Sequence, residues 1–398
     1  MSLAVLLPIT SKGCGEKIFD NLEHLSQTTL SPQKDLLQVF LGIDKGDEIL
    51  DKPDKPAEKI LQKYGIQVQS IKLKSSNPAP ICQFWRELAS VAYESQCDYY
   101  ILLGDDVTIH NPHWVEAIMD GFKKIHQRFS GLPFGFGCIA LNDIGAVGFP
   151  TFPIVHRLHL DIFGKENIIP STFINQDGDP YLFQLYKQWG GSVFLSSVTL
   201  QNSIGGLQLL EETYITPRYE RVHTDWKFDI LQKHTSILEK WINSNSKDGS
   251  HNKRKIMIDV ITPSYRVDAT FLERIVNLKV PSYCETTFII IVDNPKANIK
   301  WLREIEKEKQ GSLRVRKNPT NVGASSSRNV GLKESAADWV VFLDDDVIPD
   351  DNLLVEYSKA ITNHGDKYDG FAGTISLSFL ITLLVLIVRL YRSYCASS

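Results

Sequence analysis

Aspartates gather at four places in the sequence, each directly after a short apolar run. They are Asp44, Asp105-Asp106, Asp293 and Asp344-Asp345-Asp346. Neighbouring carboxylates repel one another, so grouping them costs free energy unless a cation lies among them. Mg²⁺ and Mn²⁺ are hard cations that bind one or two carboxylates together with substrate phosphates. The pattern predicts a divalent cation site for a diphosphate ligand, against the alternative that each aspartate caps a helix or forms a turn.

The apolar runs before these aspartates predict short strands buried on both faces of a sheet. They cover residues 4–8, 36–43, 99–103, 256–261, 288–292 and 339–343. Segments with helical spacing lie between them, at 18–25, 85–93, 114–125, 272–278 and 324–336. Alternating strands and helices predict βαβ units and a mostly parallel α/β sheet. Ligands of such sheets bind at the carboxyl ends of the strands, where the aspartates fall.

The same order of landmarks occurs twice along the chain. Pro8, Asp44 and Asp106 in the first half correspond in order to Pro263, Asp293 and Asp346 in the second. The polar segment 243–255 separates the halves and is typical of a linker. We therefore predict two tandem copies of one α/β unit, with a first domain at 1–242, a linker at 243–255, a second domain at 256–374 and a hydrophobic tail at 375–398.

The second half contains a longer motif before its triple aspartate, Asn321-Val-Gly-Ala-Ser-Ser-Ser-Arg328-Asn329-Val-Gly331. Small residues at a helix start let backbone amides approach a phosphate, and an arginine can hold a phosphate with two hydrogen bonds. The pattern NxGxxxxRNxG, with TPSYR at 262–266 before it and DDD after it, resembles family 2 glycosyltransferases of the GT-A fold. The resemblance extends from 256 to about 374.

The resemblance implies a fold class of tandem GT-A (Rossmann-like) α/β domains, the second of them only a nucleotide-binding half. It implies that Asp293 reads the nucleotide base, that Arg328 shapes the nucleotide pocket, and that Asp346 binds Mn²⁺ or Mg²⁺. The other residues expected to bind the nucleotide-sugar are Asn329, Asp344 and Asp345, with Pro8, Thr10, Asp44 and Asp105 in the first copy. Asp106 is the corresponding metal ligand of the first copy.

The first copy is long enough to include an acceptor half. Its segment 175–190 resembles the family's helix start with a catalytic base, which implies that Asp179, or its neighbour Asp177, deprotonates the acceptor. Two glycines depart from the family pattern, Gly104 in the metal motif and Gly178 before the base. A helix cap ahead of Pro180 is the alternative for both aspartates. His223 is a candidate third metal ligand, as in some GT-A enzymes.

These residues together predict a metal-dependent glycosyltransferase that moves a sugar from a nucleotide-sugar, a UDP-sugar, to a hydroxyl of a glycan, protein or lipid acceptor with inversion. The alternative is a catalytically inactive nucleotide-sugar or glycan-binding protein. A nucleotidyltransferase is disfavoured, because 10–13 is too short for a glycine-rich phosphate loop after the first strand.

Composition and termini bear on partners and location. The net charge of -4 provides no electrostatic reason to expect nucleic acid. Six cysteines without a CxxC pair are typical of a reducing compartment, and the N-terminus lacks the basic start of a signal peptide. The uncharged run 371–388 is long enough for a membrane span or for a buried core segment. We expect a cytoplasmic protein, or one anchored in the membrane by this tail with its catalytic domain in the cytosol.

Overall fold

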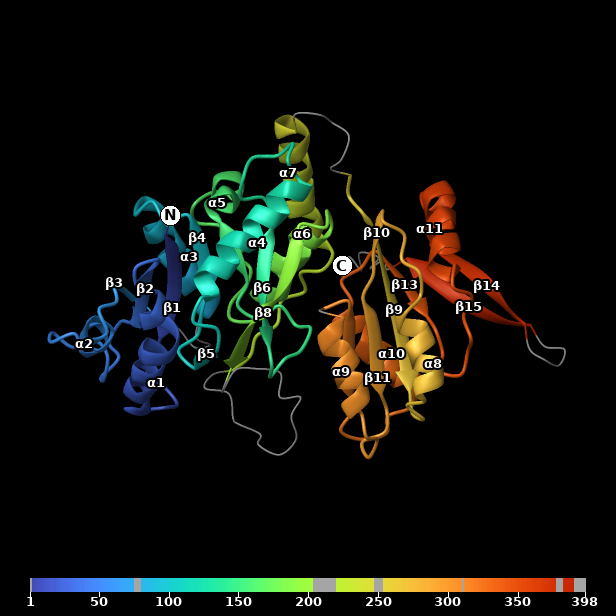
Figure 1. Ribbon diagram of the computed structural model, residues 1–398, viewed down its shortest axis with the longest axis horizontal. Helices are drawn as coiled ribbons and strands as arrows, with labels where there is room; N and C mark the ends of the chain where they lie inside the picture. The colour runs from blue at the N-terminus through green and yellow to red at the C-terminus, as the bar shows by residue number, and fades with distance from the viewer. Residues whose placement is uncertain are drawn as a thin grey trace, which may run out of the picture. The chain divides into compact units, whose positions relative to one another are not determined.

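The computed structural model describes residues 2–74, 80–202, 220–246, 253–309, 311–376 and 382–389. The chain divides into two compact units, Met1–Lys253 and Arg254–Ser398 (Figure 1). Helix α7 (Asp229–Asn245) includes the first three residues of the linker expected at 243–255. Strand β9 (Ile256–Ser264) begins directly after the last residue of that expected linker.

The first unit contains an eight-stranded sheet in the order β3-β2-β1-β4-β7-β6-β8-β5. Its strands are β1 (Leu3–Ile9), β2 (Leu37–Asp44), β3 (Val68–Leu73), β4 (Tyr99–Leu102), β5 (Val107–Ile109), β6 (Cys138–Asp143), β7 (Ile154–His156) and β8 (Ser192–Asn202). Its other helices are α1 (Lys17–Leu25), η1 (Ser26–Leu30), η2 (Ser31–Gln33), α2 (Pro56–Lys63), α3 (Ile81–Glu94), α4 (Trp114–Arg128), α5 (Arg157–Phe163) and α6 (Gly178–Lys187).

Strands β3, β2, β1 and β4 are parallel, whereas β7 is antiparallel to both β4 and β6. Every residue of β1 is buried, because the strand lies in the middle of the parallel part and α3 packs on it. Since β1 pairs in register with both neighbours, the chain segments that follow β1, β2 and β4 leave the sheet at one edge. This edge carries Thr10, Asp44 and Asp106.

The second unit contains a seven-stranded sheet in the order β12-β11-β9-β13-β15-β14, with β10 paired to β9. The strands after β9 are β10 (Cys284–Glu285), β11 (Phe288–Val292), β12 (Leu313–Lys317), β13 (Trp339–Phe342), β14 (Gly370–Ser376) and β15 (Thr382–Arg389). The helices are α8 (Ala269–Val276), α9 (Lys300–Glu308), α10 (Ala324–Glu334) and α11 (Leu353–His364). Its parallel order β12-β11-β9-β13 has the same pattern as β3-β2-β1-β4 in the first unit.

Alternate residues of the second sheet point to opposite faces, and helices cover both. Ile258 and Val260 belong to the larger cluster with residues of α8, α9 and α11. Ile261 and Ile289 belong to a smaller cluster on the other face, against which Val330 of α10 packs. The continuous apolar runs of the sequence follow from this burial on two sides.

The apolar run 371–388 forms strands where the structure describes it, which agrees with the alternative of a buried segment; the rest of the tail expected at 375–398, residues 377–381 and 390–398, lies outside the described residues. Strands β14 and β15 pair antiparallel with each other, and β15 pairs antiparallel with β13. The run extends the sheet because its backbone groups find partners on β13. No helix among the described residues is long and apolar enough to cross a membrane.

Candidate functional site

Asp293 follows β11 and holds the loop that leads into α10. It is only 4% exposed, and its carboxylate accepts hydrogen bonds from the Asn318 side chain at 2.8 Å, the Val322 N–H at 2.9 Å and the Gly323 N–H at 2.7 Å. Burial by itself would raise the pKa of Asp293, but these hydrogen bonds outweigh it and the pKa is lowered. Both carboxylate oxygens therefore anchor the loop, and a role in reading the base stays a prediction.

Glycine is favoured at the two glycine positions of NxGxxxxRNxG for two different physical reasons. Gly323 precedes the first turn of α10 with φ +85°, a conformation that residues with a side chain rarely adopt. At Gly331, an added Cβ would lie 2.4 Å from Cγ2 of Ile261, so glycine lets α10 pack against β9. Asn329 lies exposed on α10. The motif thus shapes the loop and the helix start at the carboxyl edge of the sheet.

The triple aspartate after β13 lies among arginines. Arg328 of α10 forms an ion pair with Asp344. Arg266 donates to Asp346 at 2.7 Å, and its contact with Asp345 is 3.4 Å. The sequence analysis did not single out Arg266 as a partner of these carboxylates, although it lies in TPSYR. The arginines compensate the negative charge that grouping the aspartates creates.

The donor set of this triplet fits a hard divalent cation in part. Asp345 is 9% exposed and accepts the Ser264 hydroxyl at 2.7 Å, so it is engaged within the protein. The side chains of Asp344 and Asp346 are 54% and 52% exposed. In the described parts of the chain, no three potential metal-binding side chains come together. A cation would therefore need substrate phosphates as further ligands, as Mg²⁺ commonly does.

In the first unit, the ends of β1 and β2 are tied together by Asp47, which the sequence analysis missed. Its carboxylate accepts the Ser11 N–H at 2.8 Å and the Ser11 hydroxyl at 2.7 Å, and Thr10 Oγ1 lies 3.4 Å away. The predicted Asp44 is 3% exposed and pairs with Lys12 at 2.8 Å. Pro8 is buried inside β1. An aspartate just after a strand commonly ties a turn, but the sequence does not name its partner.

Gly104 stands at the position where the family resemblance implies an aspartate. A Cβ at this position would lie 2.9 Å from Oδ1 of Asp106 and 3.4 Å from Cζ of Phe152. Asp105 is 7% exposed, and Asn21 donates to it at 3.3 Å. The Phe152 ring lies at ordinary van der Waals distance from that position, so only the Asp106 carboxylate would have to shift.

Asp179 lies half-buried in the first turn of α6, and its role as a catalytic base stays a prediction. Its Oδ1 is buried and has no hydrogen-bond partner in the protein. Burial, together with the negative charges of Asp177 and Asp143, raises the pKa of Asp179 to about 7 against the opposing effect of a hydrogen bond from the Phe152 backbone. A Cβ at Gly178 would lie 2.9 Å from Cδ1 of Ile169, so a side chain there would require Ile169 to shift.

Asp177 has a different task from Asp179. It has φ +68° and accepts hydrogen bonds from His223 Nδ1 at 3.1 Å and from the Thr224 N–H at 2.8 Å. Asp177 is the N-cap residue of α6 by position, as the capping alternative expects, but its side chain makes no capping hydrogen bond to the helix. His223 is thus hydrogen-bonded to Asp177, and its role as a metal ligand stays a prediction.

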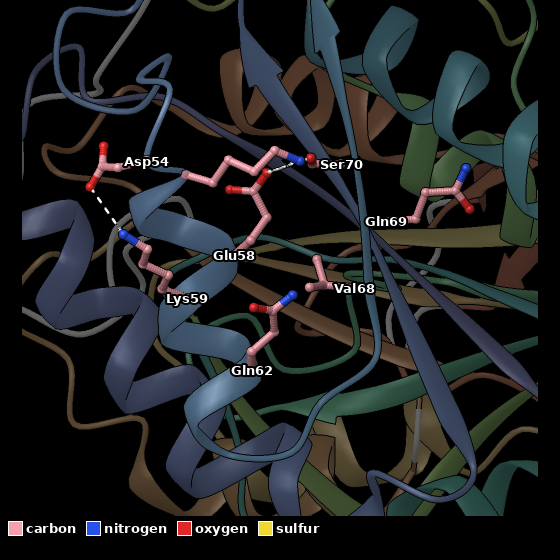
Figure 2. Close-up of a pocket in the computed structure, with 8 residues that line it drawn as sticks. Asp54, Glu58, Lys59, Gln62, Val68, Gln69 and Ser70 are labelled. Carbon is pink, nitrogen blue, oxygen red and sulfur yellow. Dashed lines mark hydrogen bonds and ion pairs between the residues drawn. The ribbon is translucent and has the colours of Figure 1, made fainter.

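A cavity of about 400 Å³ lies between α2 and the edge strand β3 (Figure 2). All of its lining residues except Val68 are of polar or charged types. Glu58 accepts the Ser70 hydroxyl at 2.5 Å, and Lys55 lies 3.7 Å from Glu58. The remaining lining residues are Asp54, Lys59, Gln62, Val68 and Gln69. None of the residues predicted to bind a nucleotide-sugar lines this cavity.

Comparison with known proteins yields matches concentrated in the second unit. Residues 259–376 match Glycosyl transferase family 2. Two uncharacterized glycosyltransferases of Haemophilus influenzae are similar, one 34% identical over 90 residues and the other 31% identical over 111 residues. These segments are 23% and 27% of this chain and 29% and 44% of the two relatives. The chain thus spans less than half the length of the curated relatives it matches.

Two solved structures are similar to a short part of this chain. S. aureus TarS 1-349 in complex with UDP-GlcNAc is 24% identical, with a TM-score of 0.25 over 29% of this chain and 33% of that one. The mannosyltransferase PcManGT from Pyrobaculum calidifontis, in complex with GDP-Man and Mn²⁺, is 18% identical, with a TM-score of 0.24 over 26% and 32%. The family match and the two curated relatives support a glycosyltransferase.

Proposed function

We propose that the chain is a glycosyltransferase that moves a sugar from a UDP-sugar to an acceptor hydroxyl with inversion at the anomeric carbon. The first unit performs the transfer, with Asp105 and Asp106 on the donor side and Asp179 on the acceptor side. The acceptor is a glycan, a protein or a lipid. The family match in the second unit supports the reaction class, and the geometry of the first unit supports the assignment of residues.

The environment of Asp179 is the observation that carries this proposal. A general base works best when its pKa lies near the working pH, and burial raises the pKa of Asp179 to about 7. Its Oδ1 is buried without a protein partner, whereas buried polar atoms are generally hydrogen-bonded. The acceptor hydroxyl is the partner that we assign to it. Asp179 takes the hydroxyl proton while the acceptor oxygen attacks the anomeric carbon and the nucleoside diphosphate leaves from the opposite face.

Asp106 in the first unit and Asp346 in the second are the residues to which we assign a divalent cation, Mn²⁺ or Mg²⁺. The exposed carboxylates of Asp344 and Asp346 have the oxygen donors that such a cation prefers. When bound, the cation would neutralise charge on the leaving diphosphate. Arg266 and Arg328 hold these carboxylates and are also able to bind phosphate oxygens.

The two units are, in this proposal, tandem copies of one GT-A-like plan. Their parallel strands follow the same spatial order, β3-β2-β1-β4 and β12-β11-β9-β13. In both copies an aspartate follows the second of these strands in the chain and an acidic pair or triplet follows the last. The second copy is only the nucleotide-binding half of this plan, with Asp293, Arg328 and Asn329 on its own nucleotide side.

The test is a transfer assay with the full chain, a panel of UDP-sugars and Mn²⁺, reading the release of UDP with and without acceptors. We expect Asp179→Asn to lower turnover by about 10²- to 10⁴-fold, the contribution of a general base. Calorimetric titration with UDP and Mn²⁺ should show unchanged binding in that variant. The control is Asp120→Asn, since Asp120 lies exposed on α4 and pairs with Lys123.

The same experiment separates the enzyme from a binding protein. Gly104 in the metal motif and the arginine-paired acidic triplet are the observations that favour binding without catalysis. UDP binding without turnover of any donor, unaffected by Asp179→Asn, would refute the enzyme and support a nucleotide-sugar or glycan-binding protein.

A further inference from the structure

The carboxyl group of Glu58 is a buried acid in the wall of the cavity between α2 and β3, and its hydrogen bonding is incomplete. Glu58 is 5% exposed, and its side chain reaches from α2 toward Ser70 of β3 (Figure 2). Its Oε1 accepts the Ser70 hydroxyl at 2.5 Å, whereas its Oε2 is buried and has no hydrogen-bond partner among the described residues. Buried polar atoms are generally hydrogen-bonded. The cavity wall therefore contains an acceptor that a bound ligand could satisfy.

The charges that line the cavity cancel. Two ammonium groups lie beside two carboxylates, in the pairs Lys59–Asp54 at 3.4 Å and Lys55–Glu58 at 3.7 Å. The other polar lining groups are two amides and a hydroxyl, which both donate and accept hydrogen bonds; they belong to Gln62, Gln69 and Ser70. An ion of either sign would meet as many like charges as opposite ones. The lining thus favours a neutral ligand whose groups both donate and accept.

The size and the lining of the cavity indicate the class of this ligand. Its volume of about 400 Å³ lies near the lower end of the roughly 300–1,000 Å³ that is typical of ligand pockets. Val68 is the one apolar residue among those that line it. An apolar ligand would leave the surrounding polar groups unpaired, which costs free energy. One or two sugar rings satisfy both conditions, because their hydroxyls donate and accept.

The cavity lies beside the first half of β3, before the carboxyl edge of the sheet. Ser70 pairs in register with Leu41 of β2. Asp44, at the carboxyl edge, pairs with Leu73. Three residues of β3, roughly 10 Å, separate Ser70 from Leu73. The lining residues and the residues assigned to the transfer reaction are therefore separate sets, which can be changed independently.

We propose that this cavity is a binding site for a neutral sugar, in addition to the candidate transfer site. Sugar hydroxyls donate to the carboxylate of Glu58 and exchange hydrogen bonds with the amides of Gln62 and Gln69. The side chain of Lys55 is 65% exposed, and an ion pair with an exposed lysine is weak. Lys55 therefore gives way when a sugar hydroxyl reaches Oε2 of Glu58.

The experiment observes the cavity directly, by NMR of the full chain labelled with carbon-13 on the valine methyl groups. The signals of Val68 are identified by their loss in Val68→Ile. The probes are the methyl glycosides of glucose, galactose, mannose and N-acetylglucosamine, added without donor. We expect at least one of them to shift the Val68 signals, and Glu58→Gln to weaken this binding about 10- to 100-fold, the effect of losing hydrogen bonds to a charged group.

Two control variants locate the binding. Glu356→Gln makes the same chemical change at an exposed glutamate of α11 that is also paired with a lysine three residues away, and it should leave the affinity unchanged. Asp179→Asn should leave it unchanged as well, because Asp179 does not line the cavity. Loss of binding in Asp179→Asn would mean that the sugar binds at the candidate transfer site, and would overturn the proposal.

The titrations of the wild type decide even if Glu58→Gln does not fold. The proposal is wrong if no methyl glycoside shifts the Val68 signals up to about 100 mM, which would saturate a site with a Kd of about 1 mM. It is also wrong if glucosamine or glucuronate shifts these signals while every neutral glycoside fails, because the site would then select a charge. Full affinity in a folded Glu58→Gln would refute the role of Glu58. None of these results depends on sugar transfer, so the proposed function stands or falls separately.

Discussion

The raised pKa of Asp179 predicts a cost in stability that grows with pH. Burial raises this pKa from 3.8 to about 7, so the folded chain binds the proton more tightly than the unfolded chain. The contribution of the Asp179 carboxyl group to the free energy of unfolding is therefore fully present below about pH 4. It is lost as pH rises through about 7. At about 1.4 kcal/mol per pKa unit, the full loss is roughly 4 kcal/mol, of which about 2–3 kcal/mol falls between pH 5 and pH 8.

Asp179→Asn should remove this loss, because asparagine is neutral at every pH. The assay is urea unfolding of the wild type and the variant at pH 5 and pH 8, followed by tryptophan fluorescence. Five of the seven tryptophans belong to the first unit, so the signal reports mainly on it; they are Trp85, Trp114, Trp189, Trp226 and Trp241. The free energy of unfolding of the variant, relative to the wild type, should rise by about 2–3 kcal/mol between the two pH values.

Asp120→Asn is the control for this measurement, because Asp120 is exposed and the pKa of its carboxyl is already lowered by Lys123. It should show no pH-dependent difference between pH 5 and pH 8. A difference between Asp179→Asn and the wild type that is the same at both pH values would refute the reasoning. A stabilised but inactive variant would illustrate a destabilising group that is kept for activity.

Three further predictions follow from the same structure. Transfer activity should rise with pH and reach half its maximum near pH 7, because the base acts only when Asp179 is ionised; a flat rate profile from pH 5 to pH 9 would contradict this assignment. Gly331→Ala should destabilise the second unit by about 1–3 kcal/mol in urea unfolding, since its Cβ would lie 2.4 Å from Ile261; an unchanged midpoint would contradict the packing argument. Arg266→Ala should tighten Mn²⁺ binding without nucleotide about 2- to 5-fold in calorimetry, because it frees Asp346 from an exposed ion pair, and weaker binding would show that Arg266 does not compete with the cation.

Local patterns were enough to predict the strands that carry the acidic groups. The run predicted at 288–292 coincides with β11, and the run at 339–343 differs from β13 by one residue. A continuous apolar run flanked by turn residues indicates a strand buried on both faces, whatever its neighbours are. The placement of Asp44 at the end of a strand, and of Asp106 and Asp293 after strands, follows from this pattern alone.

The fate of the C-terminal apolar run could not be predicted in this way. A run of apolar residues is equally compatible with a membrane helix and with a buried strand. The decision lies in hydrogen bonding, because β15 finds its partners on β13, more than 40 residues earlier in the chain. Such a pairing depends on the rest of the sheet and leaves no local signal.

The sequence by itself determined which residue types stand at the carboxyl ends of the strands, because a continuous apolar run is enough to predict a buried strand. Only the tertiary structure decided what each carboxylate contacts. Asp293 holds a loop, Asp346 pairs with Arg266, and Asp179 has one buried carboxylate oxygen without a hydrogen-bond partner in the protein. These partners come from segments distant in the chain, and burial together with neighbouring charge sets the pKa of a carboxyl group. The difference between a structural aspartate and a candidate base therefore arises only when the chain folds.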